Sequence, residues 1–378
     1  MTTTETRPDT TVPTETDDER TTACVEKVFG WILGAENITA LYLGDRLGWY
    51  RSLAADGPAT APELAARTGT AARYAREWLE QQAVCGLLTV DDPGAEPDAR
   101  RFTLPAAHVP VLADPDSEVN LAAMPRLLTA TQRHIDDLLE AYRTGGGVSW
   151  EQLGTDAREG QGDQNRGLLR KALTRDYLPL LPDVDRALRA GGRVADVGCG
   201  VGWSTVGIAG GYPTARVDAF DVDEASIDAV RANARAYGVA DRVAAHHADM
   251  ATAIDRGIAD EGGYDLVCAF ECVHDMPDPV GVLGAMRRAV AEDGTVLIMD
   301  EKVADTFAPN GDEAEQLFYG FSLLCCLPDG LSTPGSVGTG TVMRRSTLEE
   351  YARAAGFAAV EVLDELDNDM FRFYRLRP

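Results

Sequence analysis

The stretch VADVGCGVG, residues 194–202, decides the fold prediction for this chain. A short run of strand character leads directly into a loop with glycine at positions 198, 200 and 202, and a helical pattern follows. Glycine lets a backbone turn tightly and approach a ligand closely. A dinucleotide-binding loop needs a glycine where this chain has Trp203, so the loop alone indicates a nucleotide-like ligand without specifying which one.

Acidic residues near strand ends narrow the choice of ligand. Asp196 precedes the first glycine, where a carboxylate suits a cationic ligand. Asp221 ends the second predicted strand, where it can accept hydrogen bonds from both hydroxyls of a ribose. Asp249 and Met250 follow the third, and are expected to receive an adenine amino group and to pack on its ring. A helix N-cap is the alternative role for each acid, and the only role we assign to Asp223 and Asp278.

Apolar runs of strand length alternate with amphipathic helices from residue 192 onward, which predicts a doubly wound α/β domain with a parallel sheet. The expected strands are 194–197, 216–220, 243–246, 265–270 and 295–299. Two final apolar runs, 358–363 and 370–376, predict a terminal hairpin and therefore an antiparallel edge to this Rossmann-like sheet.

The N-terminal region has the pattern of a winged helix. A helical stretch over 22–55 precedes short helices at 62–68 and 71–84 and then two strand-like runs, 87–90 and 101–104. The second short helix would read DNA, but it mixes arginines with glutamates and has no basic stripe. We therefore expect this domain to pack against a partner subunit.

The remaining boundaries follow from composition and periodicity. We expect a disordered tail over 1–20, a winged-helix domain over 21–112, pocket-forming helices over 113–190, and a ligand-binding domain over 191–378. Within that domain an insertion, 302–345, contains an apolar helix (313–327) and a Gly/Ser/Thr-rich stretch (330–341). This insertion suits a lid over an apolar acceptor, and an ordinary core helix with a surface loop is the alternative. Ser346 and Glu349 are expected to form a capping box for the last helix.

Composition excludes several classes of protein. The chain has 378 residues and a formal net charge of −26, which argues against nucleic acid as a partner. No apolar stretch is long enough to span a membrane, and the N-terminus lacks the apolar region of a secretory signal. The seven cysteines have no zinc-ribbon spacing, so we expect free thiols, a cytoplasmic location and no metal site.

Taken together, these motifs resemble the cofactor motifs of class I S-adenosylmethionine (SAM)-dependent methyltransferases. The residues that carry the resemblance are Asp196, Gly198, Gly200, Gly202, Asp221, Asp249 and Met250. With its winged helix, the whole chain is similar to the plant-type and bacterial small-molecule O-methyltransferases. In that family the N-terminal domain forms a homodimer and closes over the neighbour's site. The segments 326–328 (CLP) and 338–343 (GTGTVM) resemble an actinobacterial subgroup, some of whose members are labelled transcriptional regulators.

The same resemblance assigns catalytic residues. His274 and Asp275 match the His-Asp pair that follows the fourth strand, in which the histidine is the general base, and Phe270 falls at the cofactor. A histidine suits this role because its ordinary pKa is near neutrality. Asp300 or Glu301 matches the acid that orients that histidine. Met276 replaces the family's usual tryptophan, which removes an aromatic contact to the cofactor.

The sequence therefore predicts transfer of the SAM methyl group, with S-adenosylhomocysteine (SAH) as product. The expected acceptor is a hydroxyl of an aromatic or polyketide-like secondary metabolite. A carbon or nitrogen acceptor stays open, because an enolisable carbon also needs a base. The alternative from another class is a winged-helix regulator with a SAM-sensing domain.

Overall fold

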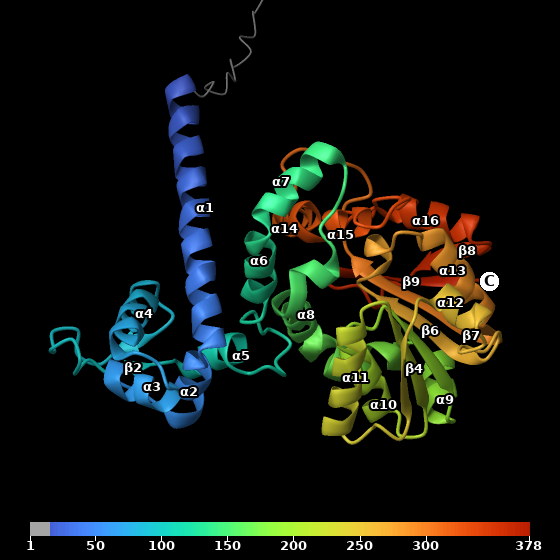
Figure 1. Ribbon diagram of the computed structural model, residues 1–378, viewed down its shortest axis with the longest axis horizontal. Helices are drawn as coiled ribbons and strands as arrows, with labels where there is room; N and C mark the ends of the chain where they lie inside the picture. The colour runs from blue at the N-terminus through green and yellow to red at the C-terminus, as the bar shows by residue number, and fades with distance from the viewer. Residues whose placement is uncertain (1–15) are drawn as a thin grey trace, which may run out of the picture.

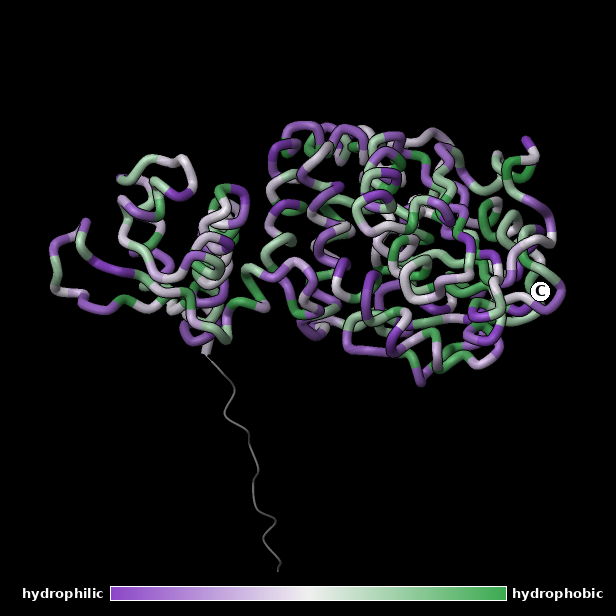
Figure 2. Tube along the Cα trace, turned by 90° about the horizontal axis from the view of Figure 1, so that it is seen from below, coloured by the Kyte–Doolittle hydropathy of each residue, from purple (hydrophilic) through white to green (hydrophobic). Residues whose placement is uncertain are grey.

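The computed structural model describes residues 16–378 and has two lobes (Figure 1). A helical N-terminal lobe stands beside a larger α/β lobe, and the view from below shows them set apart over most of their length (Figure 2). No helix in residues 16–378 combines the length and apolar character that a membrane span requires.

The N-terminal lobe is a winged helix preceded by one long helix. Its elements are α1 (Asp17–Arg46), α2 (Trp49–Asp56), α3 (Ala61–Thr68), α4 (Ala72–Val84), β1 (Thr89–Val90), β2 (Phe102–Thr103), η1 (Ala106–His108) and α5 (Val109–Leu112). The strands β1 and β2 pair antiparallel, as the wing requires. Thr60 and Glu63 form the capping box that starts α3. Trp49, Trp78 and Phe102 are buried in the core of this lobe.

Two N-terminal expectations need correction. The helical stretch over 22–55 is two helices, because the backbone turns at Gly48, whose φ is 70°. Residues 1–15 of the expected tail (1–20) lie outside the described residues. From Asp17 onward the chain is already helical, because Thr16 and Glu19 form a capping box for α1. The N-terminal helix therefore begins earlier than its apolar residues indicate.

A helical middle segment connects the lobes. It contains α6 (Met124–Arg133), α7 (Ile135–Thr144), α8 (Trp150–Gly167), η2 (Leu168–Tyr177), η3 (Leu178–Leu180) and α9 (Pro182–Arg189). Ion pairs join the end of α1 to this segment. Arg126 binds Asp45 with 2.5 Å between Nε and Oδ2, and Arg46 pairs with Asp156 and Glu159. These ion pairs link the N-terminal lobe to α8, which forms part of the wall of the candidate site.

The C-terminal lobe is a seven-stranded sheet in the order β5-β4-β3-β6-β7-β9-β8. The strands are β3 (Arg193–Val197), β4 (Arg216–Asp221), β5 (Val243–His247), β6 (Tyr264–Phe270), β7 (Val290–Glu301), β8 (Ala359–Val362) and β9 (Phe371–Arg377). The first five run parallel, and β9 pairs antiparallel with β7 and β8. The predicted Rossmann-like fold with an antiparallel terminal hairpin is confirmed.

Helices cover both faces of the sheet (Figure 1). They are α10 (Trp203–Gly211), α11 (Glu224–Ala236), α12 (Met250–Asp255), η4 (Val273–Asp275), α13 (Pro279–Ala289), α14 (Glu313–Phe321), η5 (Ser322–Cys326), α15 (Leu327–Leu331) and α16 (Arg345–Ala354). Leu283, Met286 and Leu348 pack with one set of buried strand residues, and Leu188 and Val206 with another. Burial of these side chains on both faces fixes the strand ends that form the site.

The inserted segment departs from its expected form in two ways. Its apolar helix changes pitch, because η5 is a π-helix between α14 and α15. The Gly/Ser/Thr-rich stretch is hydrogen-bonded to the loop after β6: the Val337 amide donates to the Pro277 carbonyl at 3.1 Å, and the Gly340 amide to the His274 carbonyl at 3.0 Å. This stretch therefore buttresses the His274 loop.

The capping box predicted for the last helix is wrong. Helix α16 begins at Arg345, and its N-cap, Arg344, makes no side-chain capping hydrogen bond. Glu349 pairs instead with Arg345 one turn earlier, at 2.7 Å. Because the helix begins one residue before Ser346, Ser346 lies inside the helix and cannot be its N-cap.

Candidate active site

A cavity of about 820 Å³ lies at the carboxyl ends of β3, β4, β5 and β6. Ligands of open α/β sheets bind at this edge. Helix α8 contributes Arg158, Gln161 and Asn165 to its wall, and the inserted segment contributes Phe318 and Cys326. The cavity also holds most of the predicted site residues, namely Gly198, Gly200, Asp221, Asp249, Met250, Phe270, His274, Asp275 and Glu301.

The glycine loop has the geometry of a ligand-binding turn. Gly198, Gly200 and Gly202 have φ values of 67°, 51° and 83°, a region that side chains other than glycine rarely adopt. A Cβ at Gly198 would meet Cys272 Sγ at 2.6 Å, and one at Gly202 would meet Val230 at 2.9 Å. A Cβ at Gly200 would meet no atom within 4 Å. Two of these glycines permit close packing, and the middle one faces open space where a ligand can approach.

Asp221 is held at the cavity by the backbone. Its Oδ2 accepts from the Gly200 amide at 2.8 Å and its Oδ1 from the Asp223 amide at 2.9 Å. Burial raises the pKa of Asp221, while these two amide hydrogen bonds favour the charged form. Each oxygen keeps a lone pair for a ligand hydroxyl, so the geometry is compatible with the predicted contact to a ribose.

Asp196 does not reach the cavity. Its carboxylate is 1% exposed and accepts hydrogen bonds from Ser204 Oγ at 2.7 Å and Thr205 Oγ1 at 2.5 Å. These contacts tie β3 to the start of α10, so Asp196 fixes the direction of the glycine loop. The expectation that its charge faces a ligand is therefore not supported by its position.

Three further acids, Asp249, Asp223 and Asp278, each cap the N-terminus of a helix. Asp249 caps α12, accepting from the Thr252 amide at 2.9 Å and the Thr252 hydroxyl at 2.6 Å, while Met250 is buried at the cavity wall. Asp249 is thus both an N-cap and a cavity residue. Asp223 and Asp278 are N-caps as predicted, and Asp223 also pairs with Arg158, with 2.5 Å between Nε and Oδ2.

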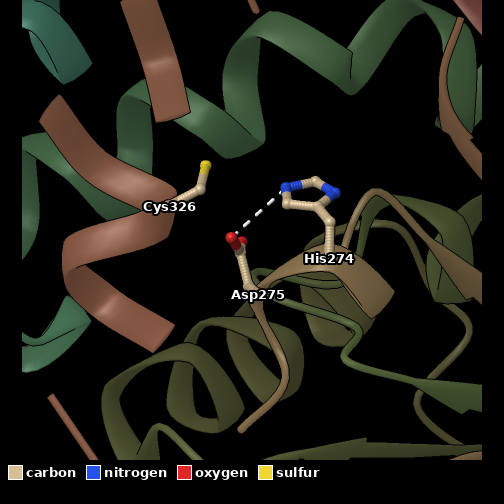
Figure 3. Close-up of side chains that lie close together, drawn as sticks. All are labelled: His274, Asp275 and Cys326. Atoms are coloured by element: carbon tan, nitrogen blue, oxygen red, sulfur yellow. Dashed lines mark ion pairs between the residues drawn. The ribbon is translucent and has the colours of Figure 1, made fainter. Parts of the chain in front are cut away.

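His274 lies among three carboxylates. Its Nδ1 is 2.6 Å from Asp300 Oδ1 and 3.1 Å from Glu301 Oε2, so both acids left open by the sequence contact the same ring nitrogen. Its Nε2 is 3.2 Å from Asp275 Oδ1, a pair drawn in Figure 3 beside Cys326. His274, Asp300 and Glu301 are 2%, 1% and 7% exposed. The strand end of β7 therefore meets the loop after β6 at one buried imidazole.

These contacts shift the ionisation of the cluster. Burial lowers the pKa of His274, but the charges of Asp275, Asp300 and Glu301 outweigh burial and raise it well above its ordinary value. Burial raises the pKa of Asp300, yet the attraction of His274 and its hydrogen bond lower it overall. Burial raises the pKa of Glu301. A positively charged imidazole held by Asp300 is the form that this arrangement favours.

Several cavity residues were not predicted from the sequence. Arg158, Gln161 and Asn165 project from one face of α8, and their polar character at spacings of three and four residues is the signal that could have identified them. Glu271, which follows β6, has no role that the sequence predicts. It has a φ of 53°, and a positive φ is unusual for a residue with a side chain.

Two groups in the described part of the chain are close enough to hold a metal ion. One is His274, Asp275 and Cys326, shown in Figure 3, and the other is His274 with Asp300 and Glu301. Each side chain in a group offers one ligand atom within 4.8 Å of the others. Both groups share the imidazole that the acids already orient, so the expectation of no metal stays a prediction that a chelator can test.

The fold and the cavity together define a Rossmann-like, nucleotide-binding domain behind a winged helix. Residues 166–362 match the methyltransferase-domain family, and the chain belongs to that family. Residues 38–113 match a second family, the Rv2258c-like winged HTH domain.

Three similar proteins illustrate the relationship. The chain is 32% identical over 167 residues to 27-O-demethylrifamycin SV methyltransferase of Amycolatopsis mediterranei, covering 43% of this chain and 56% of that one. It is 30% identical over 108 residues to polyketide synthase ThaQ of Burkholderia thailandensis, covering 29% and 5%. The chain thus spans only part of these curated relatives. The solved structure of the mitomycin 7-O-methyltransferase MmcR has the same fold, with a TM-score of 0.67, 21% identity, and coverage of 95% and 98%.

Proposed function

We propose that this protein transfers a methyl group from SAM to a hydroxyl of an apolar, aromatic or polyketide-like small molecule. The observation that carries the proposal is the placement of His274 on the same cavity as Gly200 and Asp221, with its far nitrogen bound by Asp300. A carboxylate on one ring nitrogen orients an imidazole so that the other can accept a proton.

The cavity fits the cofactor along the strand order. We infer that the ribose binds Asp221 at the end of β4, and that the adenine lies beside Met250 after β5. Asp249 stands beside it, with Thr252 already bonded to its carboxylate. The open space at Gly200 leaves room for the cofactor backbone, and Phe270 adds an apolar wall at the end of β6.

The sulfonium of SAM supplies an activated methyl group and leaves as a neutral thioether. The chain must therefore position the acceptor oxygen and remove its proton. His274 Nε2 takes the proton of the hydroxyl as the new oxygen–carbon bond forms, and Asp300 on Nδ1 stabilises the resulting imidazolium. Asp275 Oδ1 lies 3.2 Å from Nε2 and favours its protonated form, so His274 accepts the proton only after the ring has been deprotonated.

Large apolar side chains form part of the cavity wall. Leu127 and Trp150 contribute from the helical middle segment, and Phe318 and Phe321 from α14. Aromatic side chains bind flat, apolar ring systems and exclude water from the reacting groups. This wall supports an aromatic or polyketide-like acceptor, and it gives the inserted segment the role of a cover.

We also propose that α1 forms a homodimer interface. Large apolar residues on this helix face solvent, namely Val25, Phe29, Trp31, Ile32 and Leu33, with exposures between 49% and 63%. In Figure 1 the helix stands clear of the α/β lobe along most of its length. A contiguous apolar surface of this kind typically marks a protein–protein contact.

Product analysis tests the proposed reaction. The protein is incubated with SAM and a panel of phenolic and polyketide-type alcohols, and the products are fragmented by mass spectrometry. A methyl ether formed only with the wild type, and not with His274→Ala, supports the proposal. A product methylated on carbon or nitrogen would contradict the assignment of a hydroxyl acceptor. Binding of SAM without turnover on any acceptor would favour the alternative of a SAM-sensing regulator.

A further inference from the structure

Glu271 has a strained backbone conformation in the wall of the cavity. Among residues 16–378 only Glu271 and Asn310 combine a side chain with a positive φ. Such backbone strain persists where surrounding contacts enforce it, and it is concentrated at functional sites. Here the Glu271 amide donates to the Met299 carbonyl of β7 at 2.8 Å, which fixes the turn after β6 and directs the carboxyl group into the cavity wall.

Only half of this carboxyl group is satisfied by the protein. Its Oε2 accepts from Gln161 Nε2 at 3.1 Å and from Asn165 Nδ2 at 3.0 Å, two amides on α8. Its Oε1 is buried and has no hydrogen-bond partner among the described residues. A buried acceptor without a donor is costly, because it has lost its water and gained nothing in exchange.

The protein provides no free positive charge for Glu271 in the described cavity wall. Arg158 is bound to Asp223, and His274 to Asp300. Burial raises the pKa of Glu271 to about 7, so a cation beside Oε1 would favour the charged carboxylate. Since both cationic groups already have carboxylate partners, a ligand is the source of such a cation.

The strand order indicates which part of the ligand arrives there. With the ribose at β4 and the adenine at β5, the rest of the cofactor extends in the opposite direction, over β3 and then β6. Glu271 follows β6 directly. The methionine end of the cofactor carries an α-ammonium group with three N–H donors, whereas its sulfonium has none.

We propose that Glu271 Oε1 accepts a hydrogen bond from the α-ammonium of the cofactor, while Gln161 and Asn165 hold the other oxygen. Glu271 is then a cofactor-specificity residue that distinguishes SAM and SAH from adenosine derivatives lacking the amino-acid end. This assignment rests on the cofactor orientation proposed above. It also gives the polar face of α8 a function, because Gln161 and Asn165 position the carboxylate and link helix α8 to cofactor binding.

Calorimetric titration of the full chain with two probes tests the assignment. SAH carries the α-ammonium, and 5′-deoxy-5′-methylthioadenosine has the same nucleoside but no amino-acid end. In Glu271→Gln we expect the affinity for SAH to fall at least tenfold, and that for methylthioadenosine to stay within about twofold of wild type. Loss of this charge-assisted hydrogen bond should lower the affinity only for SAH, because only SAH carries the donor.

Two controls separate this inference from the proposed function. Glu350→Gln, an exposed position on α16, should leave both affinities unchanged. Asp221→Ala should weaken both probes to the same extent, because both carry the ribose. The inference is overturned if Glu271→Gln, with a melting temperature like that of the wild type, binds SAH normally or loses both probes equally. Absence of SAH binding by the wild type would overturn the proposed function itself.

Discussion

The two halves of the cavity satisfy their carboxylates in opposite ways. At β4 and β5, Asp221 and Asp249 accept hydrogen bonds from local hydroxyl and amide groups of the chain, as does Asp196 on β3, which lies outside the cavity. At β6 and β7, Glu271 Oε1 has no hydrogen-bond partner in the described structure, and Asp275 Oδ1 and Glu301 Oε2 have only the ring nitrogens of His274 nearby, at 3.2 and 3.1 Å. The first half is preformed, whereas the second half is completed by a proton, an acceptor or the cofactor's charged end.

The largest effect on activity should follow from removing His274, which lies in the half of the cavity at β6 and β7. His274→Ala removes the proposed base, and we expect kcat to fall by about 10²- to 10⁴-fold. Affinity for SAH should be unchanged within about twofold, since the glycine loop and Asp221 stay intact. Turnover numbers and calorimetry measure the two quantities separately. Full turnover in this variant would remove the base assignment.

The charge around His274 predicts an alkaline pH profile. A base acts in its deprotonated form, and the neighbouring carboxylates raise the pKa of His274 well above 6.5. The value of kcat/KM should therefore rise with pH, with a midpoint above 6.5. Asp300→Asn removes one of these charges and should shift the midpoint to lower pH while reducing kcat. A profile that is flat between pH 6 and 9 in both proteins would contradict this account.

Removing the Asp196 carboxylate should lower the stability of the fold. Asp196 is buried and binds Ser204 and Thr205. Asp196→Asn should lower the free energy of unfolding by about 1–3 kcal/mol, because buried hydroxyl groups lose a strong acceptor. Denaturant unfolding measures this change. If the variant instead keeps wild-type stability and loses SAH affinity, Asp196 contacts the ligand as its sequence position indicates.

The smallest effect is expected from metal removal. Dialysis against a chelator should leave turnover unchanged, because His274 is already oriented by acids and SAM needs no Lewis acid to activate its methyl group. Metal content measured before and after dialysis is the control. Activity that is lost on chelation and restored by one divalent ion would assign a metal site to one of the two groups that contain His274.

The sequence predicted the features that depend on local pattern. Strand-length apolar runs, the glycine loop and the acids that follow each strand are local, and the sheet order then brings Asp221, Asp249 and His274 to one edge. Both acids that the sequence left open, Asp300 and Glu301, contact His274, because the end of β7 lies beside the loop after β6.

Features that depend on tertiary contacts could not be read from the sequence. The direction of the Asp196 side chain depends on Ser204 and Thr205, eight and nine residues later. The role of Glu271 depends on Gln161 and Asn165, more than one hundred residues earlier. Neither set of contacts can be inferred from a local sequence pattern, because both form only in the folded tertiary structure.

The most direct test of the central claim is calorimetric titration with SAM and SAH, comparing the wild type with Asp221→Ala. The account predicts micromolar binding of both ligands by the wild type. It predicts a loss of about 100-fold in the variant, since hydrogen bonds from two ribose hydroxyls to a carboxylate are removed. Absence of binding by the folded wild type would contradict the assignment of this cavity as a SAM site, and with it the proposed methyl transfer.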